Sequence, residues 1–183
     1  MRKIVARLFV SLDGVTEAPE KWTSPYFNEQ VGQEIGAQMA EADTLLLGRR
    51  TYEEFAAFWP DKTAEDDPFA GYINTVPKLV VSTTLNSVEW HNSTLLSGDV
   101  AEQLAMLKQQ PGKDISITGS GTLVGSLLRQ GLLDELRLLL YPVLVGTGRR
   151  LFQDGSDQVP LELVDSRALD TGVVALVYQP ART

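Results

Sequence analysis

The chain has 183 residues, of which 43% are hydrophobic and 22% charged, and its 16 basic and 24 acidic residues give a net charge of −8. That length suits one domain, and the composition excludes a disordered or collagen-like chain. The acidic balance argues against general nucleic-acid binding, which needs clustered lysine and arginine, and the absence of cysteine excludes disulfides, cysteine nucleophiles and cysteine-based zinc sites.

Histidine occurs only once, at His91, so a serine–histidine–aspartate site would have to use that residue. Its position between Trp90 and Asn92 favours a turn residue. We expect no metal site. With so little catalytic machinery of its own, the chain would most simply borrow a reactive group from an organic cofactor.

The N-terminal segment is predicted to be a strand and not a signal peptide. Ile4, Ala6, Leu8 and Val10 alternate with other residues, Arg7 interrupts the apolar stretch, and no small-residue cleavage site follows. No apolar run reaches the roughly eighteen residues of a membrane-spanning helix. We therefore expect a cytoplasmic protein.

Strands and helices alternate through the first half of the chain. Strands are predicted over 3–10, 43–47 and 78–82, helices over 28–41 and 51–59, and an acidic loop over 61–68. One or two short edge strands are predicted within 88–96.

The second half continues this alternation and ends in strands. Helices are predicted over 99–109 and 122–130, and strands over 114–118, 135–143, 161–169 and 173–179. Asp170, Thr171 and Gly172 carry a hairpin signal between the last two strands. The order predicts one α/β domain over 1–183, with a mainly parallel sheet, helices on both faces and an antiparallel C-terminal hairpin.

Three predicted strand ends carry residues suited to one ligand, and ligands of open α/β sheets bind beyond such ends. The first is Gly48-Arg49-Arg50-Thr51, where a glycine turn precedes a helix N-terminus and arginines can meet phosphate. A helix start with solvated arginines explains the same pattern.

The second strand end is Ser82-Thr83-Thr84, whose hydroxyls suit a phosphate or ribose, or a plain β-turn. The third, Thr118-Gly119-Ser120-Gly121-Thr122-Leu123, runs from strand to glycine loop to helix and suits a phosphate cradle. It is not a Walker loop, and it departs from G-x-G-x-x-G because Val124 stands where the last glycine belongs. No acidic residue is placed for a ribose 2′-hydroxyl, which favours NADP over NAD.

Two families resemble this chain. The stretch Leu46 to Tyr52 resembles the M-G-R-x-T-W/Y element of dihydrofolate reductase. Val80–Thr83 is similar to the V-L-S strand end of that enzyme, and Thr118–Gly121 is similar to its Gly-Gly loop. A closer resemblance is to the reductase domain of bifunctional riboflavin biosynthesis enzymes and its stand-alone relatives. Their S-L-D-G and P-x-L-x-G-x-G-x-x-L-F motifs correspond to Ser11–Gly14 and Pro142–Phe152.

This resemblance implies a three-layer dihydrofolate reductase-like fold that binds NADPH and is often a homodimer. It implies that Gly48, Arg49 and Thr51 hold cofactor phosphates and that Ser82 and Thr83 lie at the 2′-phosphate. It further implies that the pyrophosphate is bound by Gly119, Ser120, Gly121, Thr122 and Leu123. The residues it places at the nicotinamide are Ala6, Gly14 and Val15.

Two carboxylates are candidate catalytic residues. Asp13 lies in the loop expected over the nicotinamide and can orient substrate or relay a proton, although Asp-Gly is also a common turn. Glu29 lies near Gly32, where the resemblance places the pterin-binding carboxylate of dihydrofolate reductase, and Glu34 is an alternative.

The sequence thus predicts an NADPH-dependent reductase that acts on a pterin- or pyrimidine-like heterocycle. Two alternatives stay open. One is a non-catalytic nucleotide-binding protein of the same fold. The other is a stand-alone 5-amino-6-(5-phosphoribosylamino)uracil reductase of riboflavin biosynthesis.

Overall fold

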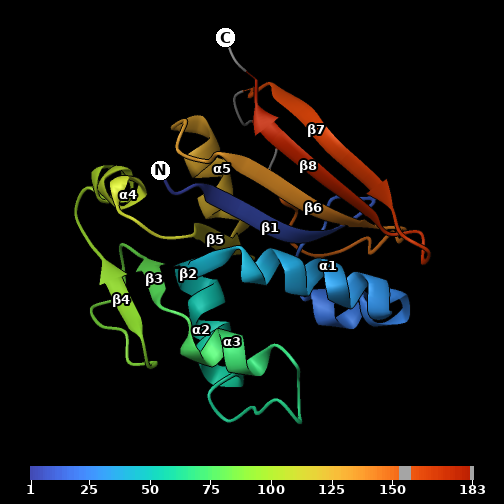
Figure 1. Cartoon of the computed structure of the whole chain (residues 1–183), viewed down its shortest axis with the longest axis horizontal. Coiled ribbons are helices and arrows are strands. Elements are labelled where there is room, and N and C mark those ends of the chain that lie inside the picture. The colour runs from blue at the N-terminus through green and yellow to red at the C-terminus, as the bar shows by residue number, and fades with distance from the viewer. Residues whose placement is uncertain (153–157, 182–183) are drawn as a thin grey trace.

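The computed structural model describes residues 1–152 and 158–181, and its centre is one eight-stranded sheet (Figure 1). The strands run in the order β4-β3-β2-β5-β1-β6-β8-β7. Their bounds are β1 (Ile4–Ser11), β2 (Ala42–Gly48), β3 (Lys78–Val81), β4 (Ser93–Leu96), β5 (Asp114–Thr118), β6 (Glu135–Tyr141), β7 (Leu161–Ala168) and β8 (Val174–Pro180). All pairings from β4 to β6 are parallel, and β8 pairs antiparallel with both β6 and β7.

Helices cover both faces of the sheet. In Figure 1, α4 (Val100–Gln109) and α5 (Gly121–Arg129) lie on one side, and α1 (Glu29–Ala40), α2 (Arg49–Phe58) and α3 (Ala70–Thr75) lie on the other. The predicted three-layer α/β architecture, with a mainly parallel sheet and an antiparallel C-terminal hairpin, is therefore confirmed. None of the described helices combines the length and the apolarity needed to cross a bilayer.

The sheet divides the core into two layers, one on each face. Successive side chains of a strand point to opposite faces and so belong to different layers. Ile4, Ala6 and Leu8 point toward α4 and α5, where they pack with helix residues such as Leu104 and Val124. On the opposite face, one apolar cluster gathers under α2 and α3 and another under α1. Because helices cover both faces, most consecutive residues of the central strands are apolar.

The predicted elements are confirmed with small shifts at their ends. Asn28 and Asp99 cap α1 and α4, since their side chains accept hydrogen bonds from the N–H groups of Val31 and Glu102. Only one strand, β4, forms within 88–96, because residues 90–92 form a turn directly before it.

The prediction missed α3. Its six residues include a glycine, an asparagine, an isoleucine and a threonine, all of which have low helix propensity. Tertiary contacts hold it: Ala70 and Ile73 are buried, and the buried Lys78 donates from Nζ to the carbonyl oxygens of Asn74 and Val76 at its C-terminal end.

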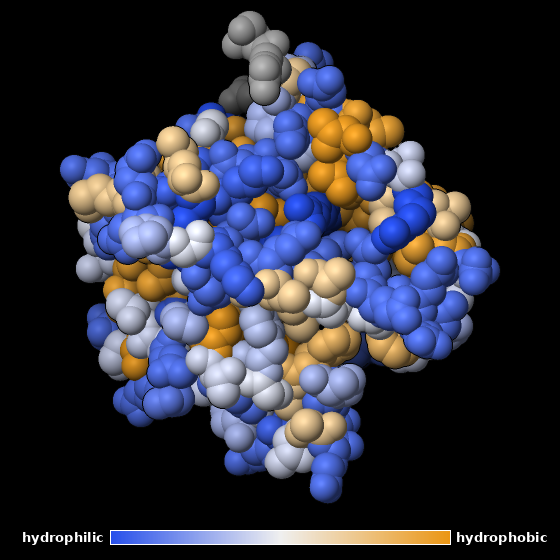
Figure 2. All heavy atoms as spheres, viewed as in Figure 1, coloured by the Kyte–Doolittle hydropathy of each residue, from blue (hydrophilic) through white to orange (hydrophobic). Residues whose placement is uncertain are grey.

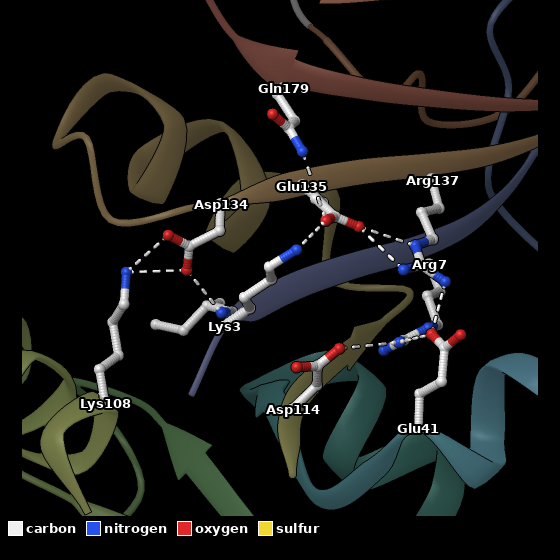
Figure 3. Close-up of polar contacts among 10 residues, drawn as sticks. Lys3, Arg7, Glu41, Lys108, Asp114, Asp134, Glu135, Arg137 and Gln179 are labelled. Atoms are coloured by element: carbon white, nitrogen blue, oxygen red, sulfur yellow. Dashed lines mark hydrogen bonds and ion pairs between the residues drawn. The ribbon is translucent and has the colours of Figure 1, made fainter. Parts of the chain in front are cut away.

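Charged side chains tie the amino ends of the central strands together (Figure 3). Glu135 on β6 accepts from Lys3 at 2.6 Å and pairs with Arg137 at 2.9 Å. Lys108 on α4 pairs with Asp134 at 2.7 Å. These pairs lie at the sheet edge opposite to the three strand ends that the sequence singles out, so their role is to stabilise the fold.

Candidate functional site

The carboxyl ends of the parallel strands meet at one edge of the sheet and bring the predicted ligand-binding segments together. Gly48 ends β2, and Gly119 follows β5, its neighbour in the sheet. Asp13 and Gly14 follow β1, the next strand. Segments about seventy residues apart thus become adjacent, as their positions after parallel strands predict.

A hydrogen-bond triangle joins the first and third of these segments. Ser120 Oγ accepts from the Gly48 N–H at 2.9 Å and lies 2.9 Å from Thr51 Oγ1, which also accepts from the Ser120 N–H at 3.1 Å. Thr51 is buried, with 8% of its surface exposed. The two helix starts are therefore held in one fixed arrangement.

Two residues with left-handed backbone, Gly119 and Ser120, allow this close approach. Gly119 has φ of +60°, and a Cβ added there would lie 3.0 Å from Thr51 Oγ1. Ser120 follows with φ of +54°, also in the left-handed region. Any side chain at Gly119 would therefore separate the two segments.

α2 and α5 both start at this triangle, and no side chain of the described residues caps either helix. The Ser120 hydroxyl, which would ordinarily cap α5, is instead used to bind Gly48. The first N–H groups of both helices remain available to an anion, and both helix dipoles favour negative charge there. The arrangement suits a pyrophosphate.

The loop after β1 contacts the same edge of the sheet through Arg150 and Leu151. The Leu151 N–H donates to the Gly14 carbonyl at 2.9 Å, and a Cβ at Gly121 would lie 3.4 Å from the Leu151 carbonyl oxygen. Val15 pairs with Arg150 in an antiparallel bridge and is buried. Leu151 thus places the Gly14 loop beside the start of α5.

Asp13 is held by three hydrogen bonds from the surrounding loops. Ser11 Oγ donates to Oδ1 at 2.6 Å, the Val145 N–H to Oδ1 at 3.1 Å and the Gly146 N–H to Oδ2 at 2.7 Å. These donors, Ser11 first, lower the pKa of Asp13 to about 2. The carboxylate therefore stays ionised at neutral pH and ties the loop after β6 to the loop after β1.

Acid should weaken this tie in a defined pH range. Because the pKa of Asp13 is about 2 in the folded state and 3.8 in the unfolded chain, its stabilisation is complete above about pH 4 and is lost as the pH falls through about 2. Asp13→Asn should lower the melting temperature near neutral pH, and the difference from the wild type should shrink across this range. A difference that is constant down to about pH 2 would contradict the assignment.

Two other predicted cofactor groups lie at the same edge with exposed surface. Ser82 Oγ, after β3, accepts from the N–H groups of Thr84 and Leu85 at 3.1 and 3.0 Å, so the segment is a turn that leaves Thr83 exposed. Arg49 is half-exposed and pairs with Glu53 one turn along α2 at 2.9 Å. That pair is exposed, so it is readily exchanged for a phosphate.

The remaining predicted residues divide into accessible and inaccessible ones. Thr122 is exposed and Leu123 half-buried on the first turn of α5. Glu29 is exposed and accepts a hydrogen bond from Gln33 at 3.0 Å, with no described contact to Asp13. Ala6 has no exposed surface and its side chain packs under α5, and its place beside the nicotinamide stays a prediction.

Sequence reasoning missed Arg7. Its guanidinium is 8% exposed and contacts Glu41 at 3.1 Å and Asp114 at 3.5 Å through Nη2, as Figure 3 shows. Its Nε and Nη1 have no partner among the described residues, and burial lowers its pKa. The buried hydroxyl of Tyr72 on α3 also has no partner among the described residues, and burial raises its pKa. The sequence does carry one signal for this residue, because Arg7 is a charged residue within the apolar stretch of a predicted buried strand.

Within the described residues, no three histidine, cysteine, aspartate or glutamate side chains are grouped as metal ligands. The site is thus a set of backbone N–H groups, hydroxyls and arginines around one carboxylate.

Comparison with known proteins adds to this geometry. The model of the RibD C-terminal domain family matches residues 2–175. The Bacillus subtilis protein YyaP is 28% identical over 190 residues, which span 97% of this chain and 94% of that protein.

Solved structures show the same fold. A putative riboflavin biosynthesis protein from Shewanella sp. PV-4 superposes with a TM-score of 0.80 at 22% identity, over 98% of this chain and 99% of its own. Dihydrofolate reductase from Enterococcus faecalis, solved as a complex with NADP(H), superposes with a TM-score of 0.65 at 15% identity, over 98% and 97% of the two chains.

Proposed function

Because the chain belongs to the RibD C-terminal domain family, we propose that it is an NADPH-dependent reductase that transfers hydride to a pterin- or pyrimidine-like heterocycle. The observation that carries this proposal is the triangle of Gly48, Thr51 and Ser120, which aims two uncapped helix N-termini at one point. The family and the fold support a reductase, and the site geometry supports a dinucleotide.

The residues present fit NADPH. The glycines at 48, 119 and 121 let Ser120, Thr51 and Leu151 pack against the backbone, and this packing brings the starts of α2 and α5 together as a pyrophosphate site needs. In this proposal Gly48, Arg49, Thr51 and the segment Gly119–Leu123 hold the phosphates, and Ser82 and Thr83 lie by the 2′-phosphate. Gly14 and Val15 lie toward the nicotinamide.

NADPH, when bound, supplies the hydride, and the chain orients the acceptor and excludes water. Asp13 is ionised, so its proposed role is to accept hydrogen bonds from the substrate and to fix the loop over the site, and not to donate a proton at neutral pH. Arg7 pairs with Glu41 and Asp114 at the amino ends of β2 and β5, so it has no proposed role in the reaction. Glu29 remains the second catalytic candidate.

Equilibrium titration of NADPH fluorescence tests the cofactor assignment, and NADPH oxidation over a panel of pterins and pyrimidines tests the reaction. Absence of binding at tens of micromolar would overturn the proposal. Binding without oxidation of any panel member would favour the non-catalytic alternative. Oxidation only with 5-amino-6-(5-phosphoribosylamino)uracil would identify a stand-alone pyrimidine reductase.

Arg49→Ala should weaken the binding of NADPH much more than that of NADH. A guanidinium beside a phosphate dianion contributes a charge-assisted interaction of about 1.5–3 kcal/mol, equivalent to roughly tenfold to a hundredfold in affinity. Arg129→Ala, at the far end of α5, is the control and should change neither affinity. Equal weakening of NADPH and NADH by Arg49→Ala would reject the 2′-phosphate assignment.

We also propose that the protein is a homodimer that pairs through the C-terminal hairpin. β7 is a sheet edge, and Leu163 and Val164 on it are 49% and 46% exposed. Figure 2 shows hydrophobic atoms over this hairpin, beside a hydrophilic band across the middle of the same face. Light scattering should give twice the chain mass of 20.1 kDa, and Val164→Lys should shift it toward the monomer. A monomeric wild type would reject this arrangement.

A further inference from the structure

One exposed arginine at the carboxyl edge of the sheet has no part in the function proposed above. Arg150 faces Val15 in the antiparallel bridge, and its Nε donates to the Asp13 carbonyl oxygen at 3.0 Å. A Cβ added at Gly14 would lie 3.8 Å from Arg150 Cδ and 4.0 Å from its Cγ, so the aliphatic part of the side chain lies along Gly14. The guanidinium is therefore anchored beside the loop after β1.

Arg150 also lies close to the start of α5. The next residue, Leu151, has its Cα 3.7 Å and its carbonyl oxygen 3.4 Å from a Cβ added at Gly121, the first residue of that helix. The proposed function places the pyrophosphate at the start of α5 and the nicotinamide toward Gly14. A dinucleotide that spans these two points carries its nicotinamide-side phosphate between them, and Arg150 contacts or adjoins both.

The charges near Arg150 favour an anion there. Arg149, the residue before it, pairs with Glu17 at 3.3 Å and with Glu54 at 3.8 Å. Among the described residues, every ion pair uses a cation other than Arg150. Asp13 holds Arg150 through its backbone carbonyl, while its carboxylate accepts from loop N–H groups.

A full positive charge is valuable at this edge because the chain carries a net charge of −8. The backbone N–H groups at the starts of α2 and α5 supply only partial charges. A guanidinium adds a full charge and a fork of donors that matches phosphate oxygens. Since Nε is the atom that bonds to Asp13, the terminal nitrogens can meet a phosphate, and the anchor lowers the entropic cost of ordering the side chain.

We propose that Arg150 is a further cofactor-binding residue, which contacts the pyrophosphate at its nicotinamide-side phosphate. This assignment rests on the proposed function, because it needs a dinucleotide that spans from α5 to Gly14. It also divides the work between two arginines. Arg49 recognises the 2′-phosphate that only NADPH carries, whereas Arg150 recognises a phosphate that NADPH and NADH share.

Arg150→Gln tests the charge without removing the anchor, because glutamine Nε2 takes the position of arginine Nε and can still donate to the Asp13 carbonyl. We expect this variant to bind NADPH and NADH more weakly by the same factor, roughly tenfold or more, in fluorescence titrations. Its affinity for 2′,5′-ADP, which lacks the nicotinamide-side phosphate, should not change. Arg150→Lys keeps the charge and should recover most of the lost affinity.

Arg129→Gln is the matched control. Arg129 is also exposed, and it lies in the last turn of α5, at the end of the helix opposite to Gly121. The same loss of charge there should leave the affinities for NADPH, NADH and 2′,5′-ADP unchanged. Melting temperatures check that all variants fold.

The Arg150 assignment and the proposed function can fail separately. If the wild type binds neither dinucleotide, the proposed function fails and the Arg150 assignment fails with it. If the wild type binds NADPH but Arg150→Gln binds it equally well, only the Arg150 assignment is wrong. Weaker binding of 2′,5′-ADP by Arg150→Gln would also overturn the assignment, since it would show a general disturbance of the site. A raised KM for the heterocycle with unchanged cofactor affinity would overturn it too, because Arg150 would then bind an anionic group of the substrate.

Discussion

Gly119→Ala is expected to weaken NADPH binding by roughly tenfold to a hundredfold. The new Cβ would lie 3.0 Å from Thr51 Oγ1 and 3.1 Å from Thr51 Cγ2, so the start of α5 must move away from α2. That movement removes one charge-assisted hydrogen bond from a backbone N–H group to the pyrophosphate, which contributes about 1.5–3 kcal/mol. Fluorescence titration with NADPH measures the loss.

Gly131→Ala is the matched control for backbone strain. Gly131 lies just beyond the other end of α5 with φ of +66°, close to the +60° of Gly119, but nothing lies within 4 Å of its added Cβ. Both variants should lose stability through the left-handed conformation, by about 1–2 kcal/mol, but only Gly119→Ala should lose affinity. Similar NADPH affinities for the two variants would show that the glycine loop does not contact the cofactor.

Asp13→Asn should lower the rate of NADPH oxidation by about a hundredfold or more, on any substrate that supports turnover. The substitution keeps the size of the side chain but removes the charge that the proposed substrate contact and the loop N–H groups of Val145 and Gly146 require. Affinity for NADPH should change little, because the phosphate-binding residues lie at the ends of β2 and β5. Steady-state kinetics and fluorescence titration separate the two effects.

Ser11→Ala provides the control for loop order. It removes the 2.6 Å hydrogen bond to Asp13 and the bond from Ser11 Oγ to the Val15 N–H, but it leaves the carboxylate in place. If the charge of Asp13 acts on the substrate, Ser11→Ala should reduce turnover much less than Asp13→Asn. Equal losses of turnover in the two variants would show that Asp13 only orders the loop and does not act on the substrate.

Most of the fold could be predicted because its signals are local. The apolar runs at 43–47 and 114–118 predict buried strands, and Asn28 and Asp99 are cap residues whose hydrogen bonds lie within three positions. α3 was missed for the converse reason. It is stabilised by burial of Ala70 and Ile73 and by Lys78, and these contacts do not appear in its own six residues.

Part of the candidate site could be predicted in the same way. The positions of Gly48, Ser82 and Gly119 after buried strands indicate a shared edge, because parallel strands align their carboxyl ends. The partners at that edge could not be predicted. Nothing local shows that Ser120 binds Gly48 and Thr51, or that both oxygens of Asp13 accept from a loop more than 130 residues away.

The sequence by itself determined the alternation of strands and helices, the glycine turns and the scarcity of reactive side chains in an acidic chain with one histidine. These features depend on residue type and on spacings of two to four residues. The tertiary structure decided which groups meet: the triangle at the two helix starts, and Glu41 and Asp114 at the buried Arg7 on β1. Such contacts depend on the order of strands in the sheet, and that order joins residues too distant for any periodicity to connect.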